Sequence, residues 1–286
     1  MEAVLNHQPQ IYLLIKNIMS VDLEDYYCDL PFSSWSKYES RVVGSTKVIL
    51  ELFDKHKVNA TFFTLGYVAE RHPELIEEIK SKGHEIATHG YSHTDLRKMD
   101  LKTFETDLTK SLKILEQISG EKILGFRAPF FSIDKRNFWT FDVLKKYLEY
   151  DSSIFPVRTP LYGIAGAKRY PYHPSHDNPL KEDVNDKFLE IPPATLPIPI
   201  IGNIPIAGGF HMRFLPLSIV KSGIKKINKN GHPAMCYVHP KDLDPETPRI
   251  PEYSWYYYWG LDNSKKKFES LLKNFSFSSV RETVLS

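Results

Sequence analysis

Cysteine is scarce in this sequence of 286 residues, which has only Cys28 and Cys236. Two cysteines form at most one disulfide bond, so a small disulfide-stabilised fold is excluded and a reducing compartment is expected. The amino terminus has an acidic residue, Glu2, where a secretory signal has basic ones, and its apolar run at residues 11–15 is shorter than such a signal requires. No run approaches the roughly 20 apolar residues that span a bilayer. We therefore expect a cytoplasmic protein that is not integral to a membrane.

A strong excess of charge of one sign is also absent. There are 37 Lys plus Arg against 35 Asp plus Glu, a formal net charge of +2. This balance provides neither the basic footprint of a nucleic-acid-binding protein nor a polybasic surface for acidic membranes. Histidine, by contrast, is well represented with 11 residues, and imidazole binds metals and transfers protons near neutral pH.

Strand-like and helical patterns alternate along most of the chain. Strands are expected at 11–22, 60–65, 85–88, 123–126, 187–192, 234–239 and 275–280, and helices at 47–56, 73–82, 101–118, 137–148, 218–229 and 264–274. Such alternation predicts parallel strands with helical crossovers, hence an α/β sheet or barrel. Eleven of the 20 prolines lie in residues 156–216, which we interpret as an irregular insertion. A single domain over residues 1–286 is the simplest organisation.

Polar residues follow several predicted strands at their carboxyl ends, where the loops of such folds bind ligands. Asp22, Glu24 and Asp25 end the first strand, His89 and His93 follow the third, and His239 closes a later one. Arg127 and Asp151 stand in similar positions. Taken singly, each has an ordinary structural explanation, such as an acidic turn, a core histidine, a salt bridge or a cap. Two histidines four residues apart can nevertheless face one metal ion.

The order of these pieces is more informative than any one of them. The segments SVDLED, THGYSH, FRAPF, DSS and YVH occur in succession between about Ser20 and Pro240. This succession resembles the five motifs of the NodB-type polysaccharide deacetylases. One subgroup of this family, associated with exopolysaccharide and exosortase gene clusters, has a carboxyl-terminal extension, which we place here at about 241–286. The sequence is similar to that subgroup at residues 205–214, 239–249 and 258–262.

The resemblance implies a distorted (β/α) barrel of about seven strands and a divalent metal ion, often zinc. By this analogy His89 and His93 bind the ion together with one carboxylate of the first motif. The sequence departs here from the commoner adjacent Asp-Asp pair, because Leu23 separates Asp22 from Glu24. Residues two apart share a strand face, which favours Glu24 as the ligand. Asp25 remains open if the strand ends at Asp22.

The resemblance also implies roles for other residues. Asp22 is the expected catalytic base, which Arg127 holds through a charge-assisted hydrogen bond. His239 is the expected acid, with Asp151 holding it and raising its pKa. A backbone N–H near Tyr91 or Phe130 is expected to stabilise the oxyanion. In the glycine-rich loop, Arg213 is a candidate substrate or structural contact.

The implied reaction is hydrolysis of an N-acetyl group on a sugar, releasing acetate. The expected partner is an N-acetylated glycan, either a polysaccharide or a lipid-linked oligosaccharide met at a membrane surface. Aromatic residues such as Phe130, Phe131, Trp139 and those of residues 253–259 offer faces for sugar rings, although core packing is the simpler explanation for most of them. Two alternatives are a related amidohydrolase acting on a small cyclic amide and a glycan-binding protein with a degraded site. Metal-dependent turnover would distinguish the deacetylase and the amidohydrolase from the glycan-binding protein.

Overall fold

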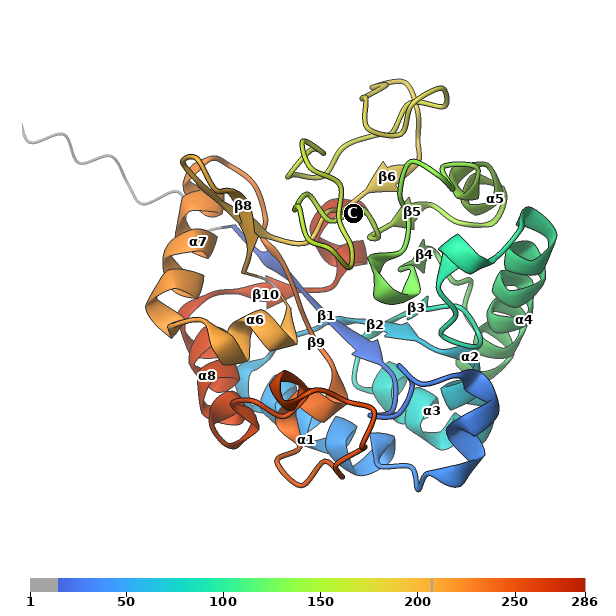
Figure 1. Cartoon of the computed structure of the whole chain (residues 1–286), viewed down its shortest axis with the longest axis vertical. Helices are drawn as coiled ribbons and strands as arrows, with labels where there is room; N and C mark the ends of the chain where they lie inside the picture. Colours follow the sequence, from blue (N-terminus) through green and yellow to red (C-terminus); the bar gives the residue numbers. More distant parts are fainter. Residues whose placement is uncertain (1–14, 207, 286) are drawn as a thin grey trace, which may run out of the picture.

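A curled sheet of short parallel strands forms the centre of the computed structural model, which describes residues 15–206 and 208–285 (Figure 1). Eight strands make up this sheet in the described ranges, in the order β10-β1-β2-β3-β4-β5-β6, with β9 also paired to β1. They are β1 (Asn17–Leu23), β2 (Thr61–Thr64), β3 (Glu85–Thr88), β4 (Gly125–Phe126), β5 (Tyr150–Asp151), β6 (Leu189–Glu190), β9 (Met235–Val238) and β10 (Phe277–Ser278). The predicted distorted (β/α) barrel is confirmed, and the strand count is close to the seven expected.

Alternation along β1 sends its side chains to two different cores. Ile18 packs in a cluster inside the barrel with residues of β2, β5 and β9. Met19 and Leu23 instead belong to the larger core between the sheet and the helices. Successive side chains of a strand point to opposite faces, so Asp22 points to the same side as Ile18. Asp22 therefore faces the barrel interior near the carboxyl end of β1.

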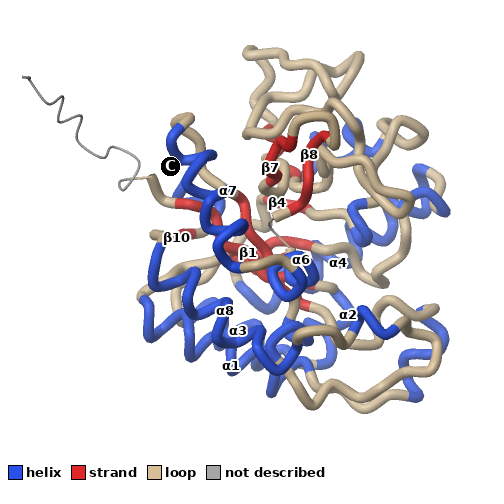
Figure 2. Tube along the Cα trace, turned by 60° about the vertical axis from the view of Figure 1, so that its left-hand side comes forward, coloured by secondary structure: helices blue, strands red, loops and turns tan. Residues whose placement is uncertain are grey.

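Eight α-helices accompany the sheet in the part of the chain that is described. They are α1 (Val42–His56), α2 (Gly66–Arg71), α3 (Pro73–Ser81), α4 (Leu101–Ser119), α5 (Thr140–Tyr147), α6 (Gly209–Phe214), α7 (Leu217–Lys229) and α8 (Leu261–Asn274). The helix α4 begins where the Asp100 side chain accepts from the Thr103 N–H at 2.8 Å, and ends at Gly120 with φ of 67°. Helices α1 and α8 pack against each other on one side of the molecule (Figure 2).

The proline-rich segment connects two edges of the barrel. It contains the antiparallel hairpin of β7 (Thr195–Ile198) and β8 (Gly202–Pro205), which forms a two-stranded sheet of its own. Just before this hairpin, the Ala194 N–H donates to the carbonyl of Met235 in β9 at 2.9 Å. The chain that follows β6 is therefore hydrogen-bonded to β9. The expected irregular segment with short strands is present, but α6 was not predicted there.

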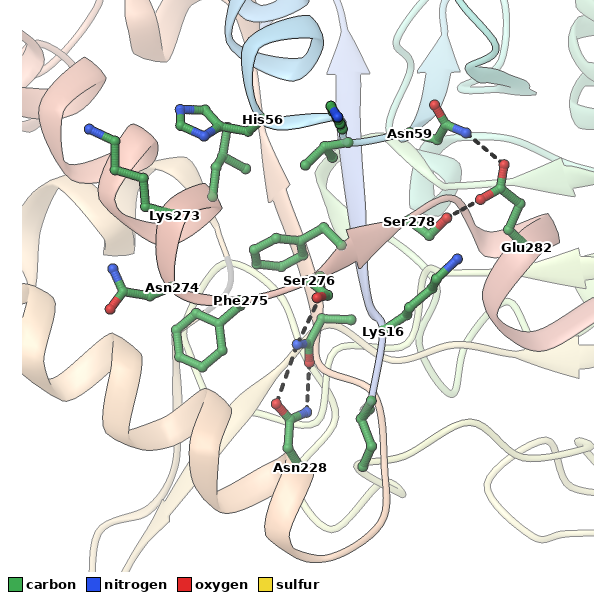
Figure 3. Close-up of a pocket in the computed structure, with 16 residues that line it drawn as sticks. Lys16, His56, Asn59, Asn228, Lys273, Asn274, Phe275, Ser276, Ser278 and Glu282 are labelled. Carbon is green, nitrogen blue, oxygen red and sulfur yellow. Dashed lines mark hydrogen bonds between the residues drawn. The ribbon is translucent and has the colours of Figure 1, made fainter. Parts of the chain in front are cut away.

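Polar side chains tie the amino-terminal end of the barrel together (Figure 3). Asn228 of α7 donates to the side-chain oxygen of Asn17 at 2.7 Å, and that oxygen also accepts the Ala234 N–H at 2.9 Å. Asn59 donates to Glu282 at 2.7 Å, which anchors the carboxyl-terminal segment beside β2. These contacts lie at the opposite end of β1 from Asp22, so we interpret them as stabilising the fold.

Most predicted elements are found within a few residues of their expected bounds. The helix expected from residue 47 begins instead at Val42, because Asp25 accepts the backbone N–H groups of Arg41 and Val42 from far away in sequence. The short helix α2 was missed. Residues 11–14 of the first expected strand lie outside the described residues. Cys28 and Cys236 are both free and buried, and none of the described helices is long and apolar enough to span a bilayer.

Candidate active site

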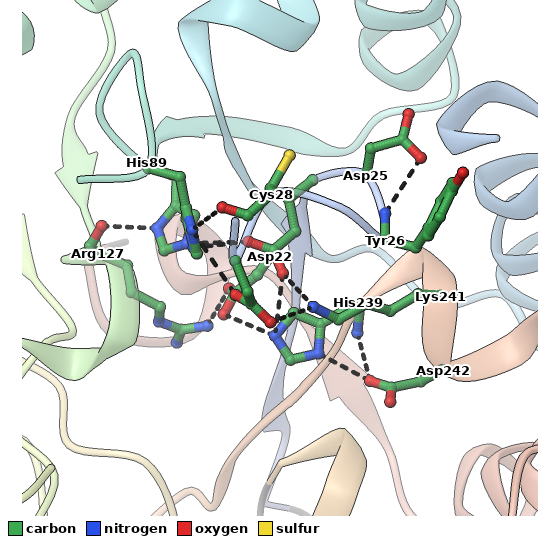
Figure 4. A network of polar contacts seen from close by, with 12 residues as sticks. Asp22, Asp25, Tyr26, Cys28, His89, Arg127, His239, Lys241 and Asp242 are labelled. Carbon is green, nitrogen blue, oxygen red and sulfur yellow. Dashed lines mark hydrogen bonds and ion pairs between the residues drawn. The ribbon is translucent and has the colours of Figure 1, made fainter. Parts of the chain in front are cut away.

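Four strands bring the predicted functional residues to one end of the barrel. Asp22 lies in β1, His89 directly follows β3, Arg127 follows β4 and His239 follows β9. Because these strands are parallel, their carboxyl ends lie at the same edge of the sheet. The side chains meet there in one polar network (Figure 4).

Asp22 and Arg127 form a buried ion pair, as the sequence predicted. The Nη1 of Arg127 donates to Oδ1 of Asp22 at 2.6 Å and to the Ser20 hydroxyl at 2.9 Å. Its remaining nitrogens donate to the backbone and side chain of Ser152. The other carboxylate oxygen, Oδ2, lies 3.8 Å from Nε2 of His239. Arg127 therefore fixes one oxygen of Asp22 and leaves the other facing the site.

Glu24, His89 and His93 form a compact, buried group whose ligand atoms all lie within 4.8 Å of one another. The Oε2 of Glu24 lies 2.7 Å from Nε2 of His93 and 3.9 Å from Nε2 of His89. The Nδ1 atoms of the two histidines contact backbone carbonyls, of Arg127 at 2.7 Å and of Cys28 at 2.9 Å. Each Nδ1 therefore carries a proton and each Nε2 is turned to the centre.

This donor set fits a divalent metal ion. Two imidazoles and one carboxylate are the protein ligands of many catalytic zinc sites, which keep further positions for water and substrate. Burial lowers the pKa of His89 to about 4, so its ring is neutral at pH 7, as a metal ligand must be. Burial alone would raise the pKa of Glu24, but the charges of His93 and Lys241 hold it well below its usual range.

Asp25, the alternative carboxylate, points away from this group. Its side chain accepts the Ser40 hydroxyl at 2.5 Å and the backbone N–H groups of Tyr26 and Arg41, each at 3.1 Å. It thereby fixes the start of α1, and Figure 4 shows it directed away from Asp22 and His89. The structure places Glu24, and not Asp25, with the histidines.

The loop between the two histidines is held from α4. Asp107 accepts the Tyr91 N–H at 2.7 Å and the Ser92 hydroxyl at 2.8 Å. Gly90 has φ of 75° and approaches Asp107 so closely that a Cβ there would lie 2.8 Å from the carboxylate. His93 itself has φ of 49°, an uncommon conformation that places its ring 4.5 Å from that of Phe130.

The oxyanion contact expected near Tyr91 does not come from the N–H of Tyr91 itself in this structure. Its backbone N–H is already donated to Asp107, and its hydroxyl donates to Glu70 at 2.7 Å. Tyr91 is absent from the described residues that line the cavity at this site, whereas Phe130 lines it. Tyr91 therefore stabilises the loop, and Phe130 stays a predicted substrate contact.

The partner predicted for His239 is also wrong. Asp242, three residues later, accepts from the His239 backbone N–H at 2.9 Å and contacts its Nδ1 at 2.8 Å. Asp151 instead accepts the Ser153 hydroxyl at 2.5 Å and pairs with buried Glu190. Burial raises the pKa of Asp151 to about 6. The physical reason is that Asp151 lies on a different strand, β5, whereas Asp242 lies in the turn that directly follows His239.

Arg213 supports Asp242. Its Nε donates to Oδ1 of Asp242 at 3.0 Å, and its Nη1 donates to the carbonyls of Tyr257 at 3.1 Å and Trp259 at 2.5 Å. A Cβ on Gly209 would lie 1.7 Å from the Asp242 carboxylate, so only glycine allows α6 to begin so close to it. Of the two roles expected for Arg213, the structure shows the structural one.

Asp242 and Lys241 are the residues that sequence reasoning missed. The Nζ of Lys241 donates to Oε1 of Glu24 at 2.7 Å and to Asp29 at 3.2 Å. Burial opposes its charge, but Asp29 and Glu24 keep the pKa of Lys241 well above its usual value. Asp242 was detectable, because a carboxylate three residues after His239, with Pro240 between them, is the spacing of a capping box. Nothing local marks Lys241.

The cavity at the site has a volume of about 560 Å³ and carries many aromatic residues. Phe130, Phe131 and Tyr162 line it, together with Tyr253, Tyr256 and Tyr257. Two tryptophans next to these tyrosines in sequence, Trp255 and Trp259, are 65% and 52% exposed. Trp139 packs against Phe104 of α4 with ring centroids 5.9 Å apart, as the structural explanation predicts.

Two family models cover most of the chain. Residues 34–147 match the model described as polysaccharide deacetylase, and residues 152–285 match a domain of unknown function, DUF3473. The chain is 35% identical over 85 residues to a peptidoglycan-N-acetylglucosamine deacetylase of Bacillus cereus, which is 30% of this chain and 31% of that protein. It is 33% identical over 106 residues to a peptidoglycan deacetylase of Helicobacter pylori, 37% and 36% of the two chains. The matches thus span about a third of these relatives.

Solved structures share the fold. A Mycobacterium smegmatis protein provisionally named a polysaccharide deacetylase aligns with a TM-score of 0.59 at 19% identity, over 92% of this chain and 87% of that one. PuuE allantoinase aligns with a TM-score of 0.58 at 16% identity, over 96% of this chain and 88% of that one. The fold and the site thus define a (β/α)-barrel protein with a candidate metal centre. With the family match, we identify residues 34–147 as a polysaccharide deacetylase domain of the NodB type.

Proposed function

We propose that this protein is a metal-dependent hydrolase that removes N-acetyl groups from sugars of a glycan. The observation that carries the proposal is the arrangement of Asp22 and His239 beside the Glu24–His89–His93 group. The Oδ2 of Asp22 and the Nε2 of His239 are 3.8 Å apart, so both can reach one acetamide. The names of the curated relatives support the same reaction class.

The chain's residues divide the proton transfers between them. Glu24, His89 and His93 would hold a divalent ion, which when bound would supply Lewis-acid chemistry to the acetamide carbonyl and to water. Asp22 accepts the proton of the attacking water through its free Oδ2. As the carbon–nitrogen bond breaks, His239 donates a proton from Nε2 to the departing amine. Acetic acid and an amino sugar leave the site. The acid ionises to acetate, and proton exchange with solvent returns Asp22 to its carboxylate and His239 to its protonated form.

His239 is suited to the acid role. Burial lowers its pKa, but the Asp242 carboxylate more than reverses this, so the pKa lies above the ordinary histidine value. His239 therefore holds its proton to higher pH than an ordinary histidine does. Asp22, already paired with Arg127, is suited to the opposite role. Placing base and acid in such different surroundings is expected of a general acid–base pair.

The substrate is proposed to be an uncharged N-acetylated sugar chain. Aromatic faces beside the cavity offer packing surfaces for sugar rings, and a net charge of +2 gives no field for a polyanion. Zinc as the ion, a lipid-linked oligosaccharide as substrate, membership of the exopolysaccharide subgroup, a single domain and a cytoplasmic location stay predictions. Cell fractionation with immunodetection tests the last of these.

Acetate release tests the proposed function. Purified protein loaded with zinc or cobalt is expected to release acetate from N-acetylglucosamine oligomers, with stoichiometric appearance of free amines. A panel of defined oligosaccharides then ranks sugar, linkage and length. Turnover of a cyclic amide such as allantoin, with none of any oligomer, would favour the alternative amidohydrolase. Glycan binding without turnover by the metal-loaded protein would favour the non-catalytic alternative.

The pH dependence should report on Asp242. Activity that needs protonated His239 falls as the pH rises through the pKa of that residue. Asp242→Asn removes the carboxylate that raises this pKa, so the alkaline limb of kcat/KM should move to lower pH. A pH profile of acetate release measures the shift, and Asp244→Asn, at a carboxylate paired with Arg41, is the matched control. An unchanged alkaline limb in Asp242→Asn would refute the acid role of His239.

A further inference from the structure

A buried lysine separates the roles of the two oxygens of Glu24. The Nζ of Lys241 donates to Oε1 at 2.7 Å, while Oε2 is turned toward the Nε2 atoms of His93 and His89. The two residues are 217 positions apart in sequence and meet only because η5 (Pro240–Leu243) follows β9 beside β1.

Lys241 is itself held firmly in place. Its side chain is 10% exposed, donates to Asp29 at 3.2 Å and lies 4.8 Å from the ring centre of Tyr257. The Tyr257 hydroxyl in turn donates to the carbonyl of Tyr26 at 2.6 Å. An ammonium fixed by these contacts is a permanent partner for one carboxylate oxygen.

A glutamate needs such a partner more than an aspartate does. It has one more rotatable bond, so an unrestrained Glu24 could present one oxygen or both to an ion. Carboxylates that present one oxygen suit small ions with few ligands, such as zinc and cobalt. Carboxylates that bind through both of their oxygens are common around larger ions with six or more oxygen ligands.

We infer that Lys241 is a positioning residue that reserves Oε2 of Glu24 for the ion by occupying Oε1. This inference rests on the metal centre in the proposed function. It predicts that the lysine sets ion preference as well as ligand orientation, because losing it frees the second oxygen. Partners of metal ligands commonly influence metal affinity 10- to 100-fold.

The test compares two ions of equal charge in the absence of substrate. Affinities of Co²⁺ and Mn²⁺ are measured by competition with a chromogenic chelator for wild type, Lys241→Met and Lys241→Arg. Removing a positive charge affects both divalent ions alike, so the ratio of the two affinities isolates the effect on ligand geometry. We expect the Co²⁺/Mn²⁺ affinity ratio to fall about 10-fold in Lys241→Met and to be retained in Lys241→Arg.

Lys145→Met is the matched control, since Lys145 also pairs with a carboxylate, Asp186 at 2.5 Å, on another part of the barrel. An equal change of both affinities in Lys241→Met would overturn the inference and leave the metal centre standing. Failure of the wild type to bind either ion would overturn both the inference about Lys241 and the proposed metal centre. If Lys241→Met does not fold, a crystal structure of the wild type with Co²⁺ decides: one Glu24 oxygen on the ion and Lys241 on the other supports the inference, and two oxygens on the ion refute it.

Discussion

Replacing Asp22 with asparagine is expected to lower kcat for acetate release about 10²- to 10⁴-fold. The change removes the proton acceptor and keeps the size of the side chain. The amide oxygen can still accept the hydrogen bond from Arg127 that Oδ1 receives at 2.6 Å. The barrel interior should therefore remain intact, and the loss should appear in kcat with metal content unchanged.

Asp25→Asn is the matched control for this experiment. Asp25 is three positions along the same segment and equally buried, but its carboxylate fixes the start of α1 and faces away from the histidines. Its replacement should cost stability of about 0.5–2 kcal/mol, as caps do, with kcat close to wild type. Thermal unfolding and acetate release measured on both variants separate the two roles. Comparable kcat values in Asp22→Asn and Asp25→Asn would exclude Asp22 as the base.

Replacing His89 with alanine is expected to remove the bound ion and reduce acetate release to background. His89 is buried, its Nδ1 contacts the Arg127 carbonyl at 2.7 Å, and its Nε2 is one of three clustered ligand atoms. A site that loses one of three protein ligands cannot hold a catalytic ion. Chelator-treated wild type should recover activity with zinc or cobalt, whereas chelator-treated His89→Ala should not.

Metal content by mass spectrometry gives this prediction a readout independent of turnover. His176→Ala is the control, because the side chain of His176 is 76% exposed and lies in the proline-rich segment. It should keep both the ion and the activity. Full activity with stoichiometric metal in His89→Ala would show that the proposed centre is wrong.

Asp22 and Glu24, two of the three carboxylates of the first motif, are held in the same way. Arg127 holds Oδ1 of Asp22 and Lys241 holds Oε1 of Glu24, so each acid keeps one oxygen for the site. Removing either cation would leave a buried carboxylate without its partner, which typically costs about 3–5 kcal/mol. The cations therefore stabilise the fold and orient the acids at the same time.

The barrel and the edge at which its site lies could be predicted from sequence alone. Hydrophobic periodicity marked most strands and helices, and parallel strands necessarily bring Asp22, His89 and His239 to the same end. Those signals are local and repeat along the chain. The start of α1 was misplaced because its cap comes from Asp25, which no local pattern reveals.

Only the tertiary structure decided which side chains pair with one another. Whether Glu24 or Asp25 joins the histidines depends on how the chain turns after β1, where the Glu24 N–H donates to the Asp22 carbonyl at 3.0 Å. Asp242 in place of Asp151 holds His239, and Lys241 reaches Glu24 across 217 residues. The sequence by itself determined most elements and their order, because periodicity is encoded locally, and the order of its motifs indicated the acids and imidazoles of the site. The partners were decided by ångström-scale distances between segments remote in sequence, which exist only in the folded chain.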